Sequence, residues 1–360
     1  MSMDDAILRP KARGRGAGYN PANRFDRLAS VAEADGWDRA EERGPLRTEV
    51  SHERPRSAIT RNTSPDLGFD RSINPFRGCE HGCIYCFSRP SHAYLGLSPG
   101  LDFETRLVAR PDMPEVLRAE LSRRAYRVAP LAIGTNTDPY QPIERDLNVM
   151  RGVLEVLQEF RHPVGIVTKG TLIERDLDIL SEMAGDGLVK VGVSITTLDA
   201  GLARRMEPRV PAPLRRLKVI ERLAGAGILV RLMASPIVPG LTDFEIERLV
   251  EAGADAGARA ASMITLRLPR EVSSLFQDWL QVHMPDRAAR VMARVREMQG
   301  GKDYASGFGT RMTGTGIYAE LLQQRFARAL RAAGLTRELP PLRCDLFRVP
   351  PRPGDQLSLF

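Results

Sequence analysis

From Phe69 onward, short apolar runs alternate along the chain with longer amphipathic ones. The short runs have the length and the β-branched content of buried strands. They predict strands at 72–76, 130–135, 163–168, 188–195, 228–235 and 262–268. The longer runs repeat apolar residues every three or four positions, as helices with one buried face do. They predict helices at 113–125, 148–160, 172–184, 212–226 and 243–257.

This alternation favours an α/β fold in which helices cover a parallel sheet. Six predicted strands with five connecting helices indicate a partial (β/α)6 barrel of the TIM type, spanning residues 61–270, rather than a closed barrel of eight units. In related barrels the loops that follow the strands converge at one face. We therefore expect the functional groups at the carboxyl ends of the strands.

The segments on either side of this core have other patterns. Residues 1–60 are rich in Arg, Gly, Pro and acidic residues and predict a loosely ordered basic leader, either a solvated tail or an arm that binds nucleic acid. Residues 271–335 carry helical patterns near 287–298 and 317–333, which would cover the flank or the open edge of the barrel. Residues 336–360 are interrupted by prolines and predict an extended tail.

Composition narrows the class of protein. No stretch reaches the roughly 18 consecutive apolar residues of a membrane helix, and the first residues lack the apolar segment of a signal peptide. We expect a cytoplasmic protein without a membrane partner. The formal net charge of +7 favours a polyanionic partner such as nucleic acid, although an arginine-rich surface can also serve only to keep a protein soluble.

Three of the four cysteines, Cys79, Cys83 and Cys86, lie in one C-x3-C-x2-C segment directly after the first predicted strand. Such clustering indicates a metal site rather than a disulfide framework. Three thiolates on a cubane iron–sulfur cluster would leave one iron free for another ligand. The alternatives are a zinc knuckle, for which no second pair of cysteines exists, or a fourth ligand from Cys344 or a nearby histidine.

The cysteine segment, with an aromatic residue before its last cysteine, resembles the signature of the radical S-adenosylmethionine (SAM) superfamily. Within it, the sequences INPFRGC, EHGCIYC and RPSHAYLG resemble the spore photoproduct lyase-like group. Four segments at predicted strand ends add to the likeness: 137–142, 168–169, 193–195 and 235–240. The resemblance implies a 4Fe-4S cluster on Cys79, Cys83 and Cys86. It also implies reductive cleavage of SAM, bound to the open iron, to a 5′-deoxyadenosyl radical that abstracts a substrate hydrogen.

The resemblance also suggests which residues bind SAM. Lys169 would pair with its carboxylate, and the small polar side chains of Ser194, Asn136 and Thr137 would hydrogen-bond its amino acid or ribose. The main chain near Tyr85 and Ala234 would frame the adenine. Asp138 is a further candidate, but it could equally stabilise its own turn through an Asx-type bond.

The substrate is less defined. Spore photoproduct lyase returns hydrogen from a cysteine just before its equivalent of Thr137, whereas residues 133–136 here contain no thiol. Arg231, within a predicted strand, would pair with a carboxylate or meet an anionic ligand. Five arginines after the fourth strand would hold phosphates or form a solvated helix face: Arg204, Arg205, Arg209, Arg215 and Arg216.

The last five residues, Gln356, Leu357, Ser358, Leu359 and Phe360, resemble the peptide with which bacterial proteins bind the DNA polymerase sliding clamp. The alternative is that this peptide docks on its own barrel. The leading prediction is a radical SAM enzyme that acts on nucleic acid, in DNA repair or modification, reduced by a donor such as flavodoxin or ferredoxin. Two alternatives stay open: radical modification of a peptide or small molecule, and a metal-bearing nucleic-acid adaptor without catalysis.

Overall fold

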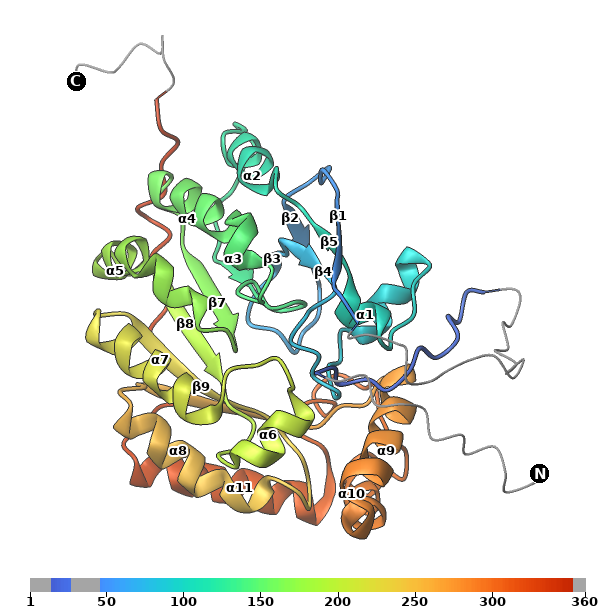
Figure 1. Cartoon of the computed structure of the whole chain (residues 1–360). Helices are drawn as coiled ribbons and strands as arrows, with labels where there is room; N and C mark the ends of the chain where they lie inside the picture. Colours follow the sequence, from blue (N-terminus) through green and yellow to red (C-terminus); the bar gives the residue numbers. More distant parts are fainter. Residues whose placement is uncertain (1–13, 27–45, 352–360) are drawn as a thin grey trace.

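A seven-stranded sheet forms the centre of the molecule within residues 14–26 and 46–351, the part of the chain that this computed structural model describes. Six strands are parallel neighbours in the order β3 (Arg71–Ile73), β6 (Leu131–Ile133), β7 (Val164–Thr168), β8 (Val189–Ser194), β9 (Leu229–Ile237) and β10 (Ala260–Thr265). β2 (Ile59–Arg61) joins the β3 edge in the antiparallel direction. Because β3 and β10 are not paired with each other, the six parallel strands form the predicted partial barrel (Figure 1).

Helices connect the strands and cover the outer face of the sheet (Figure 1). They are α2 (Met113–Leu121), α3 (Glu144–Leu147), α4 (Val149–Glu159), α5 (Leu177–Gly185), α6 (Ala200–Met206), α7 (Pro213–Gly225) and α8 (Ile246–Asp255). Two 3-10 helices, η3 (Leu172–Asp176) and η4 (Asp243–Glu245), precede α5 and α8. Each of the five connecting helices expected from the apolar periodicity is therefore present.

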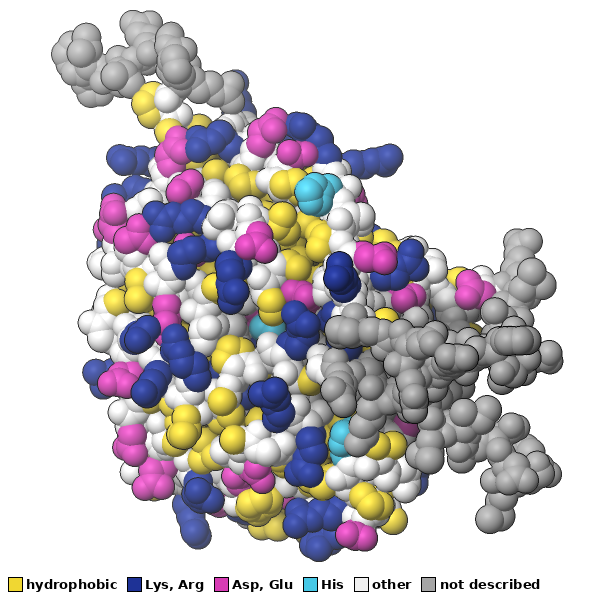
Figure 2. Space-filling model, viewed as in Figure 1, with side chains coloured by type: hydrophobic (Ala, Val, Ile, Leu, Met, Phe, Trp, Pro, Cys, Tyr) yellow, Lys and Arg dark blue, Asp and Glu magenta, His cyan; other side chains and the backbone are white. Residues whose placement is uncertain are grey.

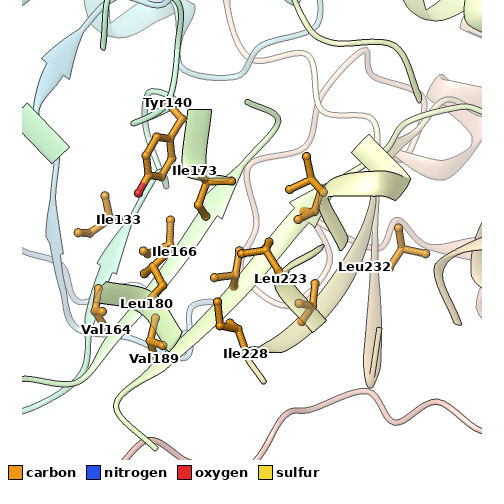
Figure 3. Close-up of a cluster of buried hydrophobic side chains, with 14 of the residues drawn as sticks. Ile133, Tyr140, Val164, Ile166, Ile173, Leu180, Val189, Leu223, Ile228 and Leu232 are labelled. Atoms are coloured by element: carbon orange, nitrogen blue, oxygen red, sulfur yellow. The ribbon is translucent and has the colours of Figure 1, made fainter. Parts of the chain in front are cut away.

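The core lies between the sheet and these helices. In β9, Val230, Leu232 and Ala234 are fully buried, whereas the residues between them are only half-buried. Alternate residues of a strand point to opposite faces, so the half-buried set lines the barrel interior. Leu232 faces α8, where a Cβ at Gly253 would lie 2.6 Å from the Leu232 Cδ2 atom. Glycine thus allows α8 to approach the sheet, and Figure 3 shows part of the resulting core.

The described parts of the expected leader differ from the loose segment predicted for them. β1 (Glu49–His52) pairs in parallel with β5 (Arg106–Ala109), and β4 (Phe76–Arg77) completes a small three-stranded sheet. The Arg15 guanidinium is buried and donates to the Glu104 carbonyl oxygen at 2.8 Å. All four β1 side chains are exposed, so backbone pairing holds the strand without leaving an apolar pattern in the sequence.

Three helices follow the barrel: α9 (Glu271–His283), α10 (Pro285–Met298) and α11 (Gly316–Ala332). α10 and α11 coincide with the two expected helices, and α9 is an additional one. α11 packs against α8 and thereby extends the outer helical layer (Figure 1). None of the described helices combines the length and the hydropathy of a membrane span.

The tail, which we define as residues 336–351, crosses the amino ends of the strands. Its first residue forms a bridge with Ala260 at the start of β10. Further along, the Arg343 N–H donates to the carbonyl oxygen of Gly187, just before β8, at 3.1 Å. Cys344 follows directly, so its thiol lies at the end of the barrel opposite to the carboxyl ends of the strands. A role for Cys344 beside the other three cysteines therefore has no support in this fold.

Candidate active site

The cysteine loop, residues 78–88, follows β4 at the carboxyl-end face of the barrel, which we call the mouth. Gly78 begins the loop with a φ of +77°, and a Cβ there would lie 2.5 Å from the Leu107 Cδ2 atom. Only glycine fits this backbone conformation and this close contact. The Cys79 N–H then donates to the Phe103 carbonyl oxygen at 2.9 Å, which fixes the direction in which the loop leaves the strand.

Arg89 supports the cysteine loop through hydrogen bonds to its main chain. Its guanidinium is completely buried and donates to the carbonyl oxygens of Cys83 at 3.0 Å and Gly82 at 3.2 Å. It also forms an ion pair with the buried carboxylate of Glu104, which accepts the N–H of Ala17 at 2.8 Å. No local pattern in the sequence predicts this pair. It ties the residues before the barrel to the loop that carries the thiols.

The three loop thiols are free, and those of Cys79 and Cys83 are only 7% and 8% exposed. Burial raises the pKa of the Cys79 thiol well above its usual value, and nearby Asp138 and Cys83 raise it further. Burial likewise raises the pKa of Cys83, partly offset by the positive charge of Lys169. Buried thiols of this kind ionise when a metal centre compensates their charge. The donor set thus suits an iron–sulfur cluster.

A single metal ion fits this arrangement less well. In the part of the chain that the structure describes, no group of three or more His, Cys, Asp or Glu side chains is placed to hold one ion. A cubane cluster binds each cysteine through a different iron, so its thiols need not converge on one point. The two loop histidines have other contacts: His81 Nδ1 lies 3.3 Å from Asp138 Oδ2, and His92 Nε2 lies 2.9 Å from the Arg106 carbonyl oxygen.

Asp138 connects the ends of β6 and β7. Its carboxylate accepts the Thr168 hydroxyl and the Lys169 N–H, both at 2.7 Å, and the N–H of Tyr140 at 2.9 Å. Burial alone would raise the pKa of this carboxyl, but the contact with His81 and these hydrogen bonds lower it to about 2. The Asx-type turn expected as one alternative is therefore present, and the Asp138 carboxylate joins this turn to the end of β7 and to His81.

Thr137 and Gln141 join the same turn to the cysteine loop. The buried Thr137 hydroxyl donates to the Phe76 carbonyl oxygen at 2.9 Å. Gln141, also buried, accepts the N–H of Glu80 at 2.8 Å and donates to the carbonyl oxygen of Gly78 at 3.2 Å. The sequence analysis did not identify Gln141, because nothing in a short turn shows that an amide side chain reaches a loop 61 residues away.

Tyr85 and Lys169 meet beside the loop. The buried Tyr85 hydroxyl donates to the Glu207 carboxylate and lies 3.0 Å from the Thr196 hydroxyl oxygen. The Glu207 carboxylate also forms an ion pair with the buried guanidinium of Arg216, at 2.7 Å. The Lys169 ammonium lies 6.0 Å from the centroid of the Tyr85 ring, and its charge reaches both Cys83 and Glu207. A half-buried ammonium thus lies next to the thiols without an ion pair among the described residues.

The remaining expected residues lie along the same face. The Ser194 hydroxyl donates to the Ser235 carbonyl oxygen at 2.9 Å, which links the ends of β8 and β9. Ala234 is fully buried, and the neighbouring Ser235 hydroxyl is buried without a hydrogen-bond partner. The Asn136 side chain is half-buried at the end of β6. The structure therefore brings polar groups from the ends of β6, β7, β8 and β9 around the cysteine loop.

Most of the arginines considered as phosphate ligands have other partners. Arg215 pairs with Glu174 at 2.5 Å and Arg209 with Glu80 at 3.1 Å. Arg231 pairs with Glu338 of the tail at 2.7 Å, as the carboxylate alternative predicted. The exposed side chains of Arg204 and Arg205 lie on α6. Of the five arginines after β8, only these two form no ion pair with another described residue.

The partial barrel carries three free thiols in one loop of its mouth. This fold and this site together indicate a metal-dependent enzyme. The family model of the radical SAM superfamily matches residues 73–253. The chain is 36% identical to an uncharacterized protein of Mycobacterium tuberculosis over 280 residues, which cover 76% of this chain and 78% of the relative. It is 26% identical to an uncharacterized protein of Methanocaldococcus jannaschii over 174 residues, which cover 48% of this chain and 62% of that one.

Among solved structures, the chain is similar to spore photoproduct lyase complexed with dinucleoside spore photoproduct. The TM-score is 0.56 at 17% sequence identity, with 79% of each chain covered. At this identity the likeness establishes the fold. The chain belongs to the radical SAM superfamily, and it is an enzyme of the radical SAM type. The family implies an iron–sulfur cluster and SAM as cofactors.

Proposed function

We propose that this radical SAM enzyme acts on nucleic acid, in DNA repair or modification, and that Cys79, Cys83 and Cys86 hold its 4Fe-4S cluster. The observation that carries the cofactor assignment is the position of three free thiols beside the Lys169 ammonium at the barrel mouth. When bound, the reduced cluster and SAM would supply a 5′-deoxyadenosyl radical. The chain's own residues position the thiols, bind the methionine and adenine ends of SAM, and shield the site from water.

Each residue has a definite part in this proposal. Lys169 would pair with the SAM carboxylate, because its ammonium acts on Cys83 and forms no ion pair with the described residues. Asn136 and the main chain near Ala234 and Tyr85 would contact the ribose and adenine. Thr137, Asp138 and Ser194 would act mainly by position, since each side chain already bonds to another strand end.

Three observations support nucleic acid as the substrate. The chain carries 52 Lys and Arg against 45 Asp and Glu. On the part of the face that is visible in Figure 2, Lys and Arg side chains are interspersed with acidic ones, so charge does not locate a binding surface in this view. The structural relative was solved with a dinucleoside photoproduct. The sliding-clamp peptide predicted at Gln356 to Phe360 lies outside the described residues and stays a prediction.

The route by which hydrogen returns to the product must differ from one that uses a thiol after β6. Residues 133–136 contain no cysteine. Cys344 lies in the tail at the amino ends of the strands, across the barrel from the mouth. We therefore propose that the product radical takes a hydrogen atom from SAM-derived 5′-deoxyadenosine or from a non-thiol side chain, or takes an electron from the flavodoxin or ferredoxin donor together with a proton from solvent. An electron donor such as flavodoxin or ferredoxin, and a cytoplasmic location, complete the proposal.

Anaerobic turnover with deuterium-labelled oligonucleotides tests the substrate assignment. The full chain, reconstituted with iron and sulfide, is reduced with dithionite in the presence of SAM and DNA that carries deuterium on its sugars, bases or thymine methyl groups. Transfer of deuterium into 5′-deoxyadenosine is the expected result. Cleavage of SAM with no label transfer from any DNA, but with transfer from labelled peptides, would reject nucleic acid and leave the cofactor assignment intact.

Deletion of residues 356–360 tests the clamp prediction separately. The intact chain should retain a bacterial sliding clamp on a column, and the truncated chain should not. Equal retention of both would reject this role for the peptide. Cleavage of SAM by the truncated chain is the control for folding, because the cysteine loop lies far from the tail.

A further inference from the structure

The loop between α10 and α11 closes the open side of the partial barrel. We call residues 301–315 the strap. Next to β10, the carbonyl oxygen of Met312 accepts the N–H of Thr265 at 2.9 Å. On the other side, Arg311 donates to the carboxylate of Asp66, which lies in the turn between β2 and β3. The strap thus links the two edges of the sheet that are not paired with each other.

Arg267 lies between the strap and the cysteine loop. It follows β10 by two residues, and its guanidinium lies 4.4 Å from the centroid of the Phe87 ring. Phe87 comes directly after Cys86, so this contact places a cation beside the third thiol. Arg267 forms no ion pair with any carboxylate in the described ranges. Burial lowers its pKa and the positive charge of Arg311 lowers it further, whereas Tyr304, Cys86 and Asp66 act in the opposite direction on this pKa.

Two fully buried arginines of this barrel differ from Arg267, which is half-buried. Arg89 pairs with Glu104 and Arg216 pairs with Glu207, and all four side chains are almost completely inaccessible. A guanidinium withdrawn from water is favourable only with an anionic or acceptor partner. Arg267 is half-buried and lies over an aromatic ring, and the nearby Asp66 acts on it through its charge without forming an ion pair, so its guanidinium remains available to an anion that arrives from solution.

The aromatic rings near Arg267 are unusually accessible for phenylalanines. Phe87 is 45% exposed and Phe308, on the strap, is 62% exposed. The Arg311 guanidinium lies 4.8 Å from the centroid of the Phe308 ring, so Phe308 belongs to the same group as Arg267 and Phe87. Exposed aromatic rings next to an uncompensated cation form the combination that binds single-stranded nucleic acid.

We propose that Phe87, Phe308 and Arg267 form a binding surface for an unpaired stretch of nucleic acid at the barrel mouth. Bases stack on the two phenylalanine rings, and Arg267 binds a phosphate. Arg311, held by Asp66, supports the Phe308 ring. The surface deepens the proposed function, because it delivers the substrate strand to the cysteine loop. Binding itself requires no SAM cleavage, so the two proposals can fail separately.

Salt-dependent binding of a fluorescent oligothymidylate to the full, reconstituted chain tests this surface. Phe308→Ala should weaken binding about tenfold with an unchanged salt slope, because it removes stacking alone. Arg267→Gln should weaken binding at low salt and reduce the slope of log affinity against log salt by about 0.7, because it removes one phosphate contact. Arg337→Gln is the matched control: this arginine also lies over a ring, that of Phe326 at 5.5 Å, but at the amino-end face. It should leave binding unchanged.

Three results would overturn the proposal. One is unchanged binding in both mouth variants. Another is equal weakening by Arg337→Gln, which would mean that net charge alone governs binding. The third is equally tight binding of a polyglutamate peptide of the same charge, which would make the surface a peptide site. Cleavage of SAM by Phe308→Ala without substrate should match that of the unaltered chain. Loss of oligothymidylate binding with cleavage retained supports the surface even where deuterium transfer from DNA fails.

Discussion

The two ends of the same parallel sheet are built in contrasting ways. At the amino-end face, the tail crosses the strands, Arg231 pairs with Glu338, and the Phe347 ring lies 5.5 Å from those of His162 and Tyr126. At the mouth, buried thiols and two cations, Lys169 and Arg267, lack such partners among the described residues. At one end the charged and aromatic groups therefore contact the tail, and the other end holds groups that a bound ligand would satisfy.

This difference indicates that the mouth, and not the amino-end face, carries functional groups that lower the free energy of unfolding. Uncompensated groups cost free energy unless something binds to them, so they accumulate at functional sites. The mouth tolerates them because two buried ion pairs lie beneath the loop, namely Arg89 with Glu104 and Arg216 with Glu207. The contrast leads to four predictions, in order of decreasing effect.

Arg89→Leu should have the largest effect. It leaves the Glu104 carboxylate buried without its cation, which costs about 3–5 kcal/mol, and it releases the carbonyl oxygens of Cys83 and Gly82. We expect a lower free energy of urea unfolding and loss of reconstituted iron. Arg118→Leu is the control, because its pair with Glu159 is largely exposed and is worth at most about 1 kcal/mol. Similar losses in both variants would refute the supporting role of the buried pair.

The amino-end face should be sensitive to acid. Burial lowers the pKa of His162 to about 4. Below about pH 6.5 the unfolded chain binds a proton that the folded chain does not bind until about pH 4. The free energy of unfolding of the metal-free chain should therefore fall by up to about 3 kcal/mol between these pH values.

Urea unfolding at a series of pH values measures this dependence. His162→Phe should remove this part of the acid sensitivity. His52→Phe, on exposed β1, should retain it. An unchanged pH dependence in His162→Phe would show that other groups determine the acid response.

Lys169→Met should raise the KM for SAM by about 10- to 100-fold, because it removes a charged hydrogen bond worth about 1.5–3 kcal/mol. The cluster content should stay the same. Lys190→Met is the matched control, since Lys190 lies in the neighbouring strand β8 but at its amino end. Steady-state formation of 5′-deoxyadenosine provides the comparison. A larger increase in the KM for SAM in Lys190→Met than in Lys169→Met would mean that SAM binds at the amino-end face and not at the mouth.

Thr137→Val should have the smallest effect. It removes the hydrogen bond to the Phe76 carbonyl oxygen and should lower the free energy of unfolding by about 1–2 kcal/mol, with little change in the KM for SAM. Asn136→Ala should do the opposite, because its side chain forms no hydrogen bond with the described residues and lies half-buried at the mouth. Together, the two variants distinguish a residue that positions the strand ends from a residue that contacts SAM. A raised KM for SAM in Thr137→Val, with an unchanged free energy of unfolding, would contradict this distinction.

The sequence predicts those features of the fold that have a local pattern. The apolar runs at Val164–Thr168 and Val189–Ser194 locate buried strands, and the spacing of the cysteines locates the metal loop. β1 was not predicted because backbone pairing, not apolar burial, holds it.

Partners of the site that are far apart in sequence were also not predicted. Glu104 and Arg89 are 15 residues apart, and Tyr85 and Glu207 are 122 apart. No periodicity connects such residues, because the fold alone brings them together. Arg267 could not be singled out for the same reason. In its sequence pattern it resembles any polar residue of a half-buried strand, and only the structure shows that it forms no ion pair with the described residues.

The most direct test of the central claim is reductive cleavage of SAM by four single cysteine variants of the reconstituted chain. Cys79→Ala, Cys83→Ala and Cys86→Ala should each lose the brown cluster and form no 5′-deoxyadenosine. Cys344→Ala, with its thiol at the opposite end of the barrel, should retain both. Undiminished cleavage in any of the first three variants, or its loss in Cys344→Ala alone, would contradict the assignment of the site.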